Sequence, residues 1–524
     1  MNSPLAQPTP AEEASVPPHV AAPPRRALVV DTLADSVVIL LVLTILQRGA
    51  GFVRGMLFCR WLTPEELGEW EMCFSFLMLA APAAIFSLPG AFGRYLEFFR
   101  VRGQYRLFFR RTGYTVAILA AIVSSVVAYC APQFSQFVFG RDDQVILIHA
   151  LSMTLVLVIG YNYTVDLFTA LRMQRVSSLL QVVNTGLFAV LGIGLLLAWP
   201  SGALSVVIAY GGAAAGTLLV AVPYMWHAWQ AAPHVEQPIA HASFWHKLIP
   251  YALSLWATNW LANLFAIVDR YMIIHWSDMD ADTALNAVGQ YHAARLIPLL
   301  LIQFAGLLGT MLLPHLTHDW EAGRMQTVSR RLNLFLKTLG LAVFAFGVAV
   351  LLTAPVLFEI FFHGKYAVGL TLLPLTVGYC LWNSLGCVAR TYLCCDERVS
   401  LVSVAYGVGL AVNVGLNLVL LTRLGLIGAV WSALAGNVAT LALLFVLSYV
   451  RGLTPDRGAI LVSLLPAACC GGLVTALPVA VAVLGVTLFT GWILSAQEKR
   501  ELLALLASYR QRLIRGRKPV TTEG

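Results

Sequence analysis

Residues 331–361 read RLNLFLKTLGLAVFAFGVAVLLTAPVLFEIF, and this stretch decides the class of fold. No charged residue lies between Lys337 and Glu359. A continuous apolar run of this length is typical of a helix that crosses about 30 Å of hydrocarbon. The apolar residues do not alternate with polar ones, which argues against an outer-membrane β-barrel. The stretch therefore predicts a transmembrane helix.

The composition of the whole chain agrees with that prediction. Of the 524 residues, 59% are hydrophobic and only 11% are charged, whereas a soluble domain usually has about 25% charged residues. A soluble enzyme, a disordered protein and a collagen-like chain are therefore excluded. The net charge of +8 indicates loops held at an anionic leaflet rather than a nucleic-acid partner.

Apolar runs recur along the chain and predict an all-α polytopic membrane protein with about fourteen transmembrane helices. The expected spans are 31–59, 68–90, 107–131, 144–171, 177–199, 202–226, 246–276, 286–316, 331–361, 367–391, 399–422, 425–450, 459–474 and 477–494. The last two are the shortest, because they share only 459–494.

The basic residues indicate the orientation of these spans. With the N-terminus inside, most of the 34 Lys and Arg residues fall on the cytoplasmic side, as the positive-inside rule requires. The outer connections hold only Arg60, Arg141, Lys365 and Arg423. Both termini are therefore expected in the cytoplasm. Residues 1–28 are predicted to be a disordered tail, and 495–524 a basic tail whose helix lies on the inner leaflet.

An internal repeat divides the chain. Val53-Arg54-Gly55-Met56 and Leu67-Gly68-Glu69-Trp70 resemble Val268-Asp269-Arg270-Tyr271 and Val288-Gly289-Gln290-Tyr291. Both copies lie where an odd span ends outside and the next begins, so the halves have the parallel topology known from secondary transporters. The expected domains are two six-helix lobes, a linker, and two further helices. Their bounds are 29–227 and 246–450 for the lobes, 228–245 for the linker and 451–494 for the further helices.

Five charged side chains lie deep in the predicted spans, where charge is costly and usually functional. They are Arg48 and Arg54 in the first span, Asp269 and Arg270 in the seventh, and Arg295 in the eighth. Their positive excess suits a polyanion such as a lipid diphosphate, which Arg binds in a bidentate manner. The alternative is structural. Arg54 and Asp269 would then form an ion pair that closes an outer gate, and Arg270 and Arg295 would extend to the interface.

Other polar residues favour ordinary roles. Asp166 is interpreted as a helix-end charge. Hydrogen bonding between helices explains Asn259, Asn263, Asn413 and Asn417 as well as substrate contact does. The basic cluster between 94 and 111 is expected to set topology and bind anionic lipids, or to recruit the lipid substrate or a glycosyltransferase. No P-loop, HExxH or GxSxG motif occurs, so neither catalytic residues nor metal ligands are predicted.

The motifs carry a family resemblance over roughly 30–495. Arg60-Trp61-Leu62-Thr63-Pro64-Glu65-Glu66-Leu67-Gly68-Glu69-Trp70, together with Asp269-Arg270-Tyr271, Val288-Gly289-Gln290-Tyr291 and Pro314, resembles the polysaccharide-transporter (Wzx-type flippase) branch of the multidrug/oligosaccharidyl-lipid/polysaccharide (MOP) superfamily. The resemblance implies a V-shaped, alternating-access carrier of lipid-linked oligosaccharide in the bacterial plasma membrane.

The same resemblance sets the other expectations. The carrier would be a monomer without a bound cofactor, with possible coupling to an H⁺ or Na⁺ gradient. Its partners would be the lipid-linked oligosaccharide, anionic lipids, and glycosyltransferases or a polymerase of the same pathway. Two alternatives stay open: a multidrug or cation antiporter of this superfamily, and an integral-membrane component of a polysaccharide synthesis complex.

Overall fold

A computed structural model describes residues 33–101, 104–230 and 240–501, and within these ranges every regular element is a helix. Ten helices in this part of the chain are long and apolar enough to cross a membrane, or eleven if one bent pair counts as a span. The predicted all-α polytopic fold is thereby confirmed. The predicted tail over 1–28, residues 231–239 of the linker and residues 502–524 of the basic tail lie outside the described residues.

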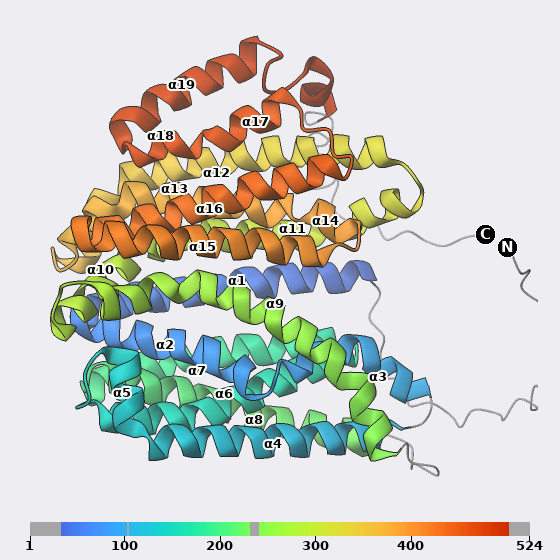
Figure 1. The fold of residues 1–524 in the computed structure, drawn as a ribbon, viewed down its shortest axis with the longest axis vertical. Coiled ribbons are helices and arrows are strands. Elements are labelled where there is room, and N and C mark those ends of the chain that lie inside the picture. Colours follow the sequence, from blue (N-terminus) through green and yellow to red (C-terminus); the bar gives the residue numbers. More distant parts are fainter. Residues whose placement is uncertain (1–32, 102–103, 231–239, 502–524) are drawn as a thin grey trace, which may run out of the picture.

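In the first half of the chain, the described residues form eight α-helices and one 3₁₀ helix (Figure 1). They are α1 (Leu33–Trp61), α2 (Pro64–Ala84), η1 (Leu88–Ala91), α3 (Phe92–Val101), α4 (Tyr105–Tyr129), α5 (Ala131–Phe139), α6 (Val145–Ala170), α7 (Gln174–Ala198) and α8 (Ala203–Gln230).

The second half forms the remaining helices. They are α9 (His241–Trp276), α10 (Ala281–Leu296), α11 (Leu299–Glu321), α12 (Met325–Phe362), α13 (Ala367–Ala389), α14 (Thr391–Cys395), α15 (Val399–Leu424), α16 (Leu426–Val450), α17 (Arg457–Leu464), α18 (Pro466–Cys470) and α19 (Leu473–Phe489). A helix, or two consecutive helices, occupies each of the fourteen predicted spans.

Two groups of helices lie one above the other in Figure 1. In the first, α7 packs on α1 and α8, and α6 on α4 and α8. In the second, α16 packs on α13 and α15, and α13 on α11 and α12. The long helix α9 runs diagonally between the groups and packs on η1 and α2 as well as on α15. The predicted domains assign residues 241–245 of α9 to the linker and the rest of α9 to the second lobe, and that division stays a prediction.

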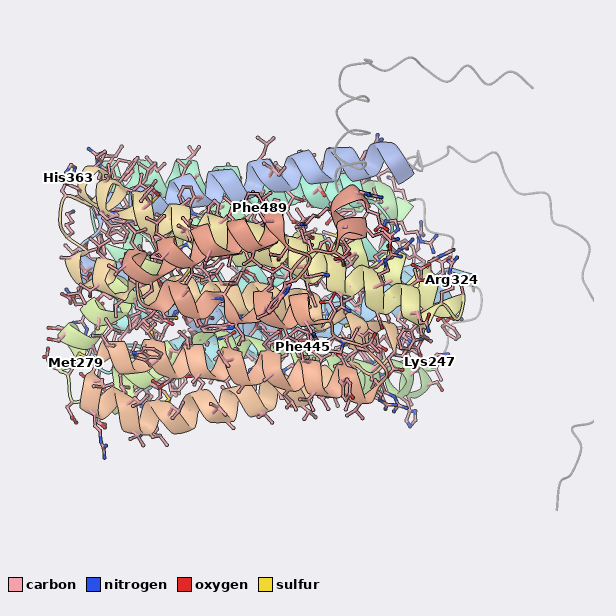
Figure 2. The ribbon with its side chains drawn as sticks, turned by 90° about the horizontal axis from the view of Figure 1, so that it is seen from above. Lys247, Met279, Arg324, His363, Phe445 and Phe489 are labelled. Carbon is pink, nitrogen blue, oxygen red and sulfur yellow. The ribbon has the colours of Figure 1, made fainter. Side chains whose placement is uncertain are left out.

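The bundle has two ends, which Figure 2 labels. Lys247 and Arg324 lie at one, and Met279 and His363 at the other. We call them the Lys247 end and the Met279 end. The predicted topology makes the Lys247 end cytoplasmic.

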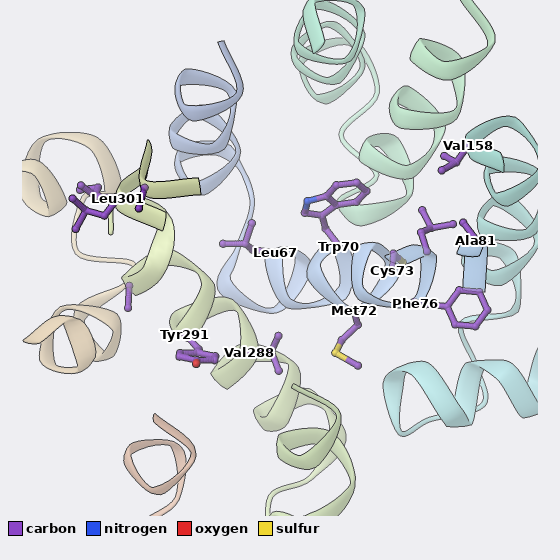
Figure 3. Close-up of a cluster of buried hydrophobic side chains, with 14 of the residues drawn as sticks. Leu67, Trp70, Met72, Cys73, Phe76, Ala81, Val158, Val288, Tyr291 and Leu301 are labelled. Atoms are coloured by element: carbon purple, nitrogen blue, oxygen red, sulfur yellow. The ribbon is translucent and has the colours of Figure 1, made fainter. Parts of the chain in front are cut away.

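The helix α2 occupies the centre of the molecule, and its start is encoded locally. Pro64 stands in its first turn, the Thr63 hydroxyl accepts from the backbone N–H of Glu66, and the Glu66 carboxylate accepts from that of Thr63. This reciprocal capping begins the helix at the Met279 end. Buried side chains of α2, including Leu67 and Met72, belong to one apolar cluster with Val288 of α10 (Figure 3).

The span that begins with α2 is broken near its other end. The axis bends by 57° between Pro64–Ala84 and Leu88–Phe99. Phe86 and Ser87 connect the two parts with φ of 49° and 47°, a left-handed conformation that costs a non-glycine residue about 1–3 kcal/mol. Irregular backbone at membrane depth is tolerated where it is buried in protein or lines a cavity.

The C-terminal helices attach to α12 through a buried charge. Lys337 is only 2% exposed, and its ammonium donates to Asp456 at 2.6 Å and to Glu498 at 2.5 Å. Burial by itself would raise the pKa of Glu498, but the hydrogen bonds from Lys337 and from the Ser495 backbone outweigh it and lower that pKa. The predicted last two spans correspond to shorter apolar helices, Arg457–Cys470 and Leu473–Phe489.

Candidate functional site

A cavity of about 280 Å³ lies at the junction of α1, α2, α7, α8 and α10. Its polar lining residues come from both halves of the chain: Arg54, Glu71, Asn184, Thr185, Tyr210 and His292. Gly51 and Gly55 of α1 also line it. The cavity therefore contains one of the predicted site residues and several that the sequence analysis did not select.

Arg54 stacks on an aromatic ring inside this cavity. Its guanidinium carbon lies 4.1 Å from the ring centroid of Phe188, which is a cation–π contact. Among the described residues, no carboxylate forms an ion pair with Arg54. The described residues thus hold this positive charge at a fixed place without an acidic partner, and its N–H groups can bind a ligand.

A second cavity, of about 350 Å³, adjoins the first, and both are lined by Phe74 and Tyr210. It extends between α2, η1, α6, α8 and α9, along the break in the α2 span. The only ionisable group among its lining residues besides Tyr210 is Asp166. The sequence analysis interpreted Asp166 as a helix-end charge, but the structure places it in this cavity.

A buried ion pair joins the two halves of the chain beside the first cavity. The Glu71 carboxylate of α2 accepts from Arg270 of α9 at 2.5 Å and lies 2.8 Å from Nδ1 of His292 on α10. Arg270 also donates to the Ser75 hydroxyl at 2.6 Å. Removing one partner of such a pair leaves an uncompensated buried charge and costs about 3–5 kcal/mol. Glu71 therefore favours the arrangement in which α2, α9 and α10 are in contact.

Asp269, next to Arg270, belongs to a polar network within the second half. Its carboxylate accepts from Asn413 at 2.8 Å, from Asn417 at 3.3 Å and from Tyr291 at 3.4 Å. Asn413 and Asn417 thus bridge helices α15 and α9, which is one of the two roles left open by the sequence analysis. Arg295 lies over the ring of Tyr291, 4.9 Å from its centroid.

The predicted gate between Arg54 and Asp269 is not formed in this conformation. Arg54 lies on Phe188, whereas Asp269 is satisfied by amides and a phenol. The ion pair across the halves joins Glu71 to Arg270 instead. Arg48 is exposed on α1 and lines neither cavity. The structure thus brings Asp269, Arg270 and Arg295 into one buried region and Arg54 into a cavity.

The Met279 end is closed above these residues by a close helix crossing. A Cβ atom on Gly68 of α2 would lie 1.9 Å from the Leu285 carbonyl oxygen, and one on Gly289 of α10 would lie 1.8 Å from that of Pro64. Only glycine permits this approach. Gly68 and Gly289 are the matching glycines of the internal repeat, so the repeat supplies both sides of the closure.

Charges at the rim reinforce the crossing. Arg141 pairs with Glu69 at 2.5 Å and Glu65 at 3.4 Å in the first half, and with Asp282 in the second. Burial would lower the pKa of Arg141, but these carboxylates and Asp143 raise it. Lys365 donates to the Arg60 carbonyl oxygen at 2.9 Å.

Sequence reasoning missed Glu71, His292 and the cavity position of Asp166. Glu71 follows the repeat motif directly. An available signal was its place within the predicted span 68–90, seven residues after the first residue of α2, where an acidic group needs a partner. His292 follows the second motif at once, and its contact with Glu71 crosses the two halves.

Comparisons with known proteins agree with this architecture. The lipid II flippase MurJ in an inward closed conformation superimposes with a TM-score of 0.65 at 13% identity, over 91% of this chain and 100% of that one. An inward-facing multidrug MATE transporter of the MOP superfamily gives 0.64 at 14%, over 79% and 97%. A MOP transporter from Pyrococcus furiosus gives 0.58 at 14%, over 79% and 95%. At these identities the likeness shows the fold alone.

No curated protein matches the sequence. The sequence pattern of one family, described as polysaccharide biosynthesis protein, matches residues 33–318, which is more than half of the chain. The prediction of a multi-pass membrane protein with a transporter fold is confirmed. The chain belongs to the polysaccharide biosynthesis protein family and has the fold of the MOP transporters.

Proposed function

We propose that this protein is a flippase that moves a polyprenyl-diphosphate-linked oligosaccharide across the bacterial plasma membrane by alternating access. The direction is from the Lys247 end, in the cytoplasm, to the Met279 end. Membership of the polysaccharide biosynthesis family supports the substrate class, and the resemblance in fold to a lipid II flippase supports the type of transport.

The observation that carries the proposal is Arg54, a cation without an acidic partner in a cavity within the membrane-spanning bundle. Burying an unpaired charge there is costly, so a ligand that supplies the opposite charge binds with a corresponding advantage. The planar guanidinium matches phosphate oxygens, which it contacts through two parallel N–H groups. The diphosphate of a lipid-linked sugar has this chemistry. Arg48, also on α1, is proposed to attract the same headgroup earlier on its path.

The closure at the Met279 end supports the alternating-access part of the proposal. The glycine crossing and the ion pairs of Arg141 lie at that end, and the Glu71–Arg270 pair borders the first cavity. A substrate held at Arg54 would leave only after α2 separates from α9 and α10. Coupling to an H⁺ or Na⁺ gradient is proposed as the energy source. Asp269, Arg270 and Arg295 are proposed to contact substrate once this region opens.

Proteoliposomes test the function directly. Arg54→Gln should lower the initial rate of translocation of a fluorescent undecaprenyl-diphosphate sugar about tenfold or more, since one charge-assisted contact contributes about 1.5–3 kcal/mol. Arg423→Gln removes an exposed arginine at the end of α15 and serves as the matched control. Wild-type translocation by Arg54→Gln at equal reconstitution would contradict the proposal.

A second candidate function, the export of organic cations, is favoured by one observation. Asp166 is an acidic group without an ion-pair partner in the second cavity, and MATE transporters share the fold. Transport of a lipophilic cation such as tetraphenylphosphonium, abolished by Asp166→Asn, would support this alternative. The third possibility, a non-transporting component of a synthesis complex, predicts no translocation of either compound.

A further inference from the structure

The second cavity has the composition of a sugar-binding site, and its one carboxylate, Asp166, has the opposite charge to Arg54 in the first cavity. Its lining includes the amides of Asn162, Asn259 and Asn263, the carboxylate of Asp166 and the aromatic ring of Tyr210. Amides and carboxylates are the usual partners of sugar hydroxyls, because they accept and donate in fixed directions. The first cavity, by contrast, carries the unpaired cation Arg54.

Several polar groups of this cavity lack partners among the described residues. Asp166, Asn162 and Asn259 are exposed although they lie between packed helices, and none of them makes a hydrogen bond or ion pair with a described residue. Asn263 uses its amide nitrogen to bind the Met78 carbonyl oxygen at 3.1 Å, which leaves its own oxygen as an acceptor.

The broken helix adds a further unsatisfied group at the same place. Ser87 lines the cavity, is 6% exposed, and its hydroxyl has no hydrogen-bond partner among the described residues. Ser87 has a left-handed φ of 47° at the break of the α2 span, and it lines the same cavity as Asp166. Strained backbone and buried unsatisfied groups both persist where a site is built for a ligand.

We propose that the second cavity is the glycan subsite of the transporter, and that Asp166 makes it selective for a sugar without a carboxylate. This inference rests on the proposed function and names its substrate class. The diphosphate lies at Arg54, and the first sugars extend past Phe74 and Tyr210 to Asp166. There the carboxylate accepts hydrogen bonds from hydroxyl groups. A uronic acid at that position would bring two like charges together in a site of low dielectric constant, where their repulsion is strong.

Binding to the full-length protein in lipid nanodiscs tests the inference. Three probes are compared: undecaprenyl diphosphate, the same lipid carrying an uncharged N-acetylhexosamine, and the same lipid carrying a hexuronic acid. Wild-type protein should bind the N-acetylhexosamine probe about tenfold more tightly than the hexuronic acid probe, a ratio equivalent to about 1.4 kcal/mol. Asp166→Asn should bring that ratio close to one, mainly by improving binding of the acidic probe.

Two further variants separate the subsite from the diphosphate site. Asp142→Asn, which neutralises an exposed carboxylate of the loop after α5, is the matched control and should keep the wild-type ratio. Asn259→Ala should weaken binding of the N-acetylhexosamine probe and leave binding of undecaprenyl diphosphate unchanged. If Asp166→Asn does not fold, Asn259→Ala still tests the subsite. Arg54→Gln should weaken binding of all three probes by a similar factor.

The possible failures are distinguishable. If wild-type protein binds none of the probes, the proposed function and the subsite both fall. If Arg54→Gln weakens the diphosphate but Asp166→Asn leaves the sugar ratio unchanged, only the subsite is overturned. If Asp166→Asn instead abolishes binding of tetraphenylphosphonium with the sugar ratio unchanged, the carboxylate belongs to a cation site and the inference is wrong.

Discussion

Glu71 is the residue on which the contact between the two halves depends most. It is a single buried carboxylate that contacts Arg270 and His292, and both partners lie about 200 residues further along the chain. A buried pair of this kind contributes little net stability, because desolvation opposes the Coulomb attraction. It discriminates strongly, however, between a conformation in which both partners are in place and one in which they are apart. Glu71 thus favours the closed conformation over one in which the two halves are apart.

Neutralising this carboxylate should therefore shift the population of conformations. In Glu71→Gln the shape is kept, but Arg270 loses its counter-charge in a buried place, at a cost of about 3–5 kcal/mol to the closed state. Spin labels at Asp142 and Glu359, exposed at the Met279 end in different halves, should report longer distances than in wild type. Glu321→Gln, an exposed change near the Lys247 end, is the control. An unchanged distance distribution in Glu71→Gln would show that the pair does not hold this end closed.

The charged residues show how far single positions can be interpreted from sequence. Depth in a span correctly marks Arg54 and Asp269 as groups that need a physical explanation, since charge is rare there. It does not reveal the partner. Arg54 and Asp269 match in the repeat and have opposite charges. Arg54 nevertheless contacts the ring of Phe188, and Asp269 accepts a hydrogen bond from Asn413. Pairing depends on how helices rotate and pack, and that information is spread over residues far apart in the chain.

Among the helices, the crossing of α2 and α10 determines how closely the halves approach. Small residues let helix backbones come together in membranes, where no hydrophobic force drives helices against each other. Here the approach is so close that one methyl group on either glycine would overlap a carbonyl oxygen of the other helix. A larger residue at either glycine therefore cannot be accommodated by repacking a side chain, because the atom it would overlap belongs to the backbone.

A single methyl group at this crossing should open the Met279 end. Gly68→Ala places a Cβ 1.9 Å from the Leu285 oxygen, so α2 and α10 must separate or the protein must adopt its other conformation. The Asp142–Glu359 label distance should lengthen, and a membrane-impermeant thiol reagent should gain access to Cys73, which is buried in α2. Gly306→Ala in α11 is the control, because a Cβ there meets nothing within 4 Å. Closed distances and a protected Cys73 in Gly68→Ala would contradict this view.

Helices were easier to predict than their interruptions. Each expected span corresponds to helix in the structure, since a long apolar run in lipid has no other way to satisfy its backbone. The break at Phe86 and Ser87 was not predicted, although Pro89-Gly90 stands just after it. Proline and glycine are tolerated inside membrane helices, so their presence alone does not show whether the backbone bends or continues.

The two ends of the molecule differ in charge. The basic residues Lys247 and Arg324 lie at one end, and the acidic loop that contains Met279 lies at the other. The positive-inside rule relates this asymmetry to orientation, because basic segments are retained in the cytoplasm. The direction of transport proposed above depends on that orientation.

Cysteine labelling of intact cells tests the orientation. Met279→Cys should react with an impermeant maleimide added outside, whereas Gly323→Cys, in the turn between α11 and α12, should react only after the cells are opened. Both are compared with the wild-type protein, whose own cysteines are buried or partly buried. Reaction of Gly323→Cys in intact cells would reverse the assigned direction of transport.

The glycine crossing also bears on how such a molecule originates. Gly68 approaches Leu285 and Gly289 approaches Pro64, and the separation along the chain is 221 residues for both matched pairs, 68 with 289 and 64 with 285. Equivalent residues thus contact each other reciprocally, which is the definition of an isologous interface. A half-length ancestor would have formed the same contact as a parallel homodimer, and gene fusion would then have freed each copy to diverge. The opposite charges of Arg54 and Asp269 at matching positions would then result from divergence of the two copies after fusion.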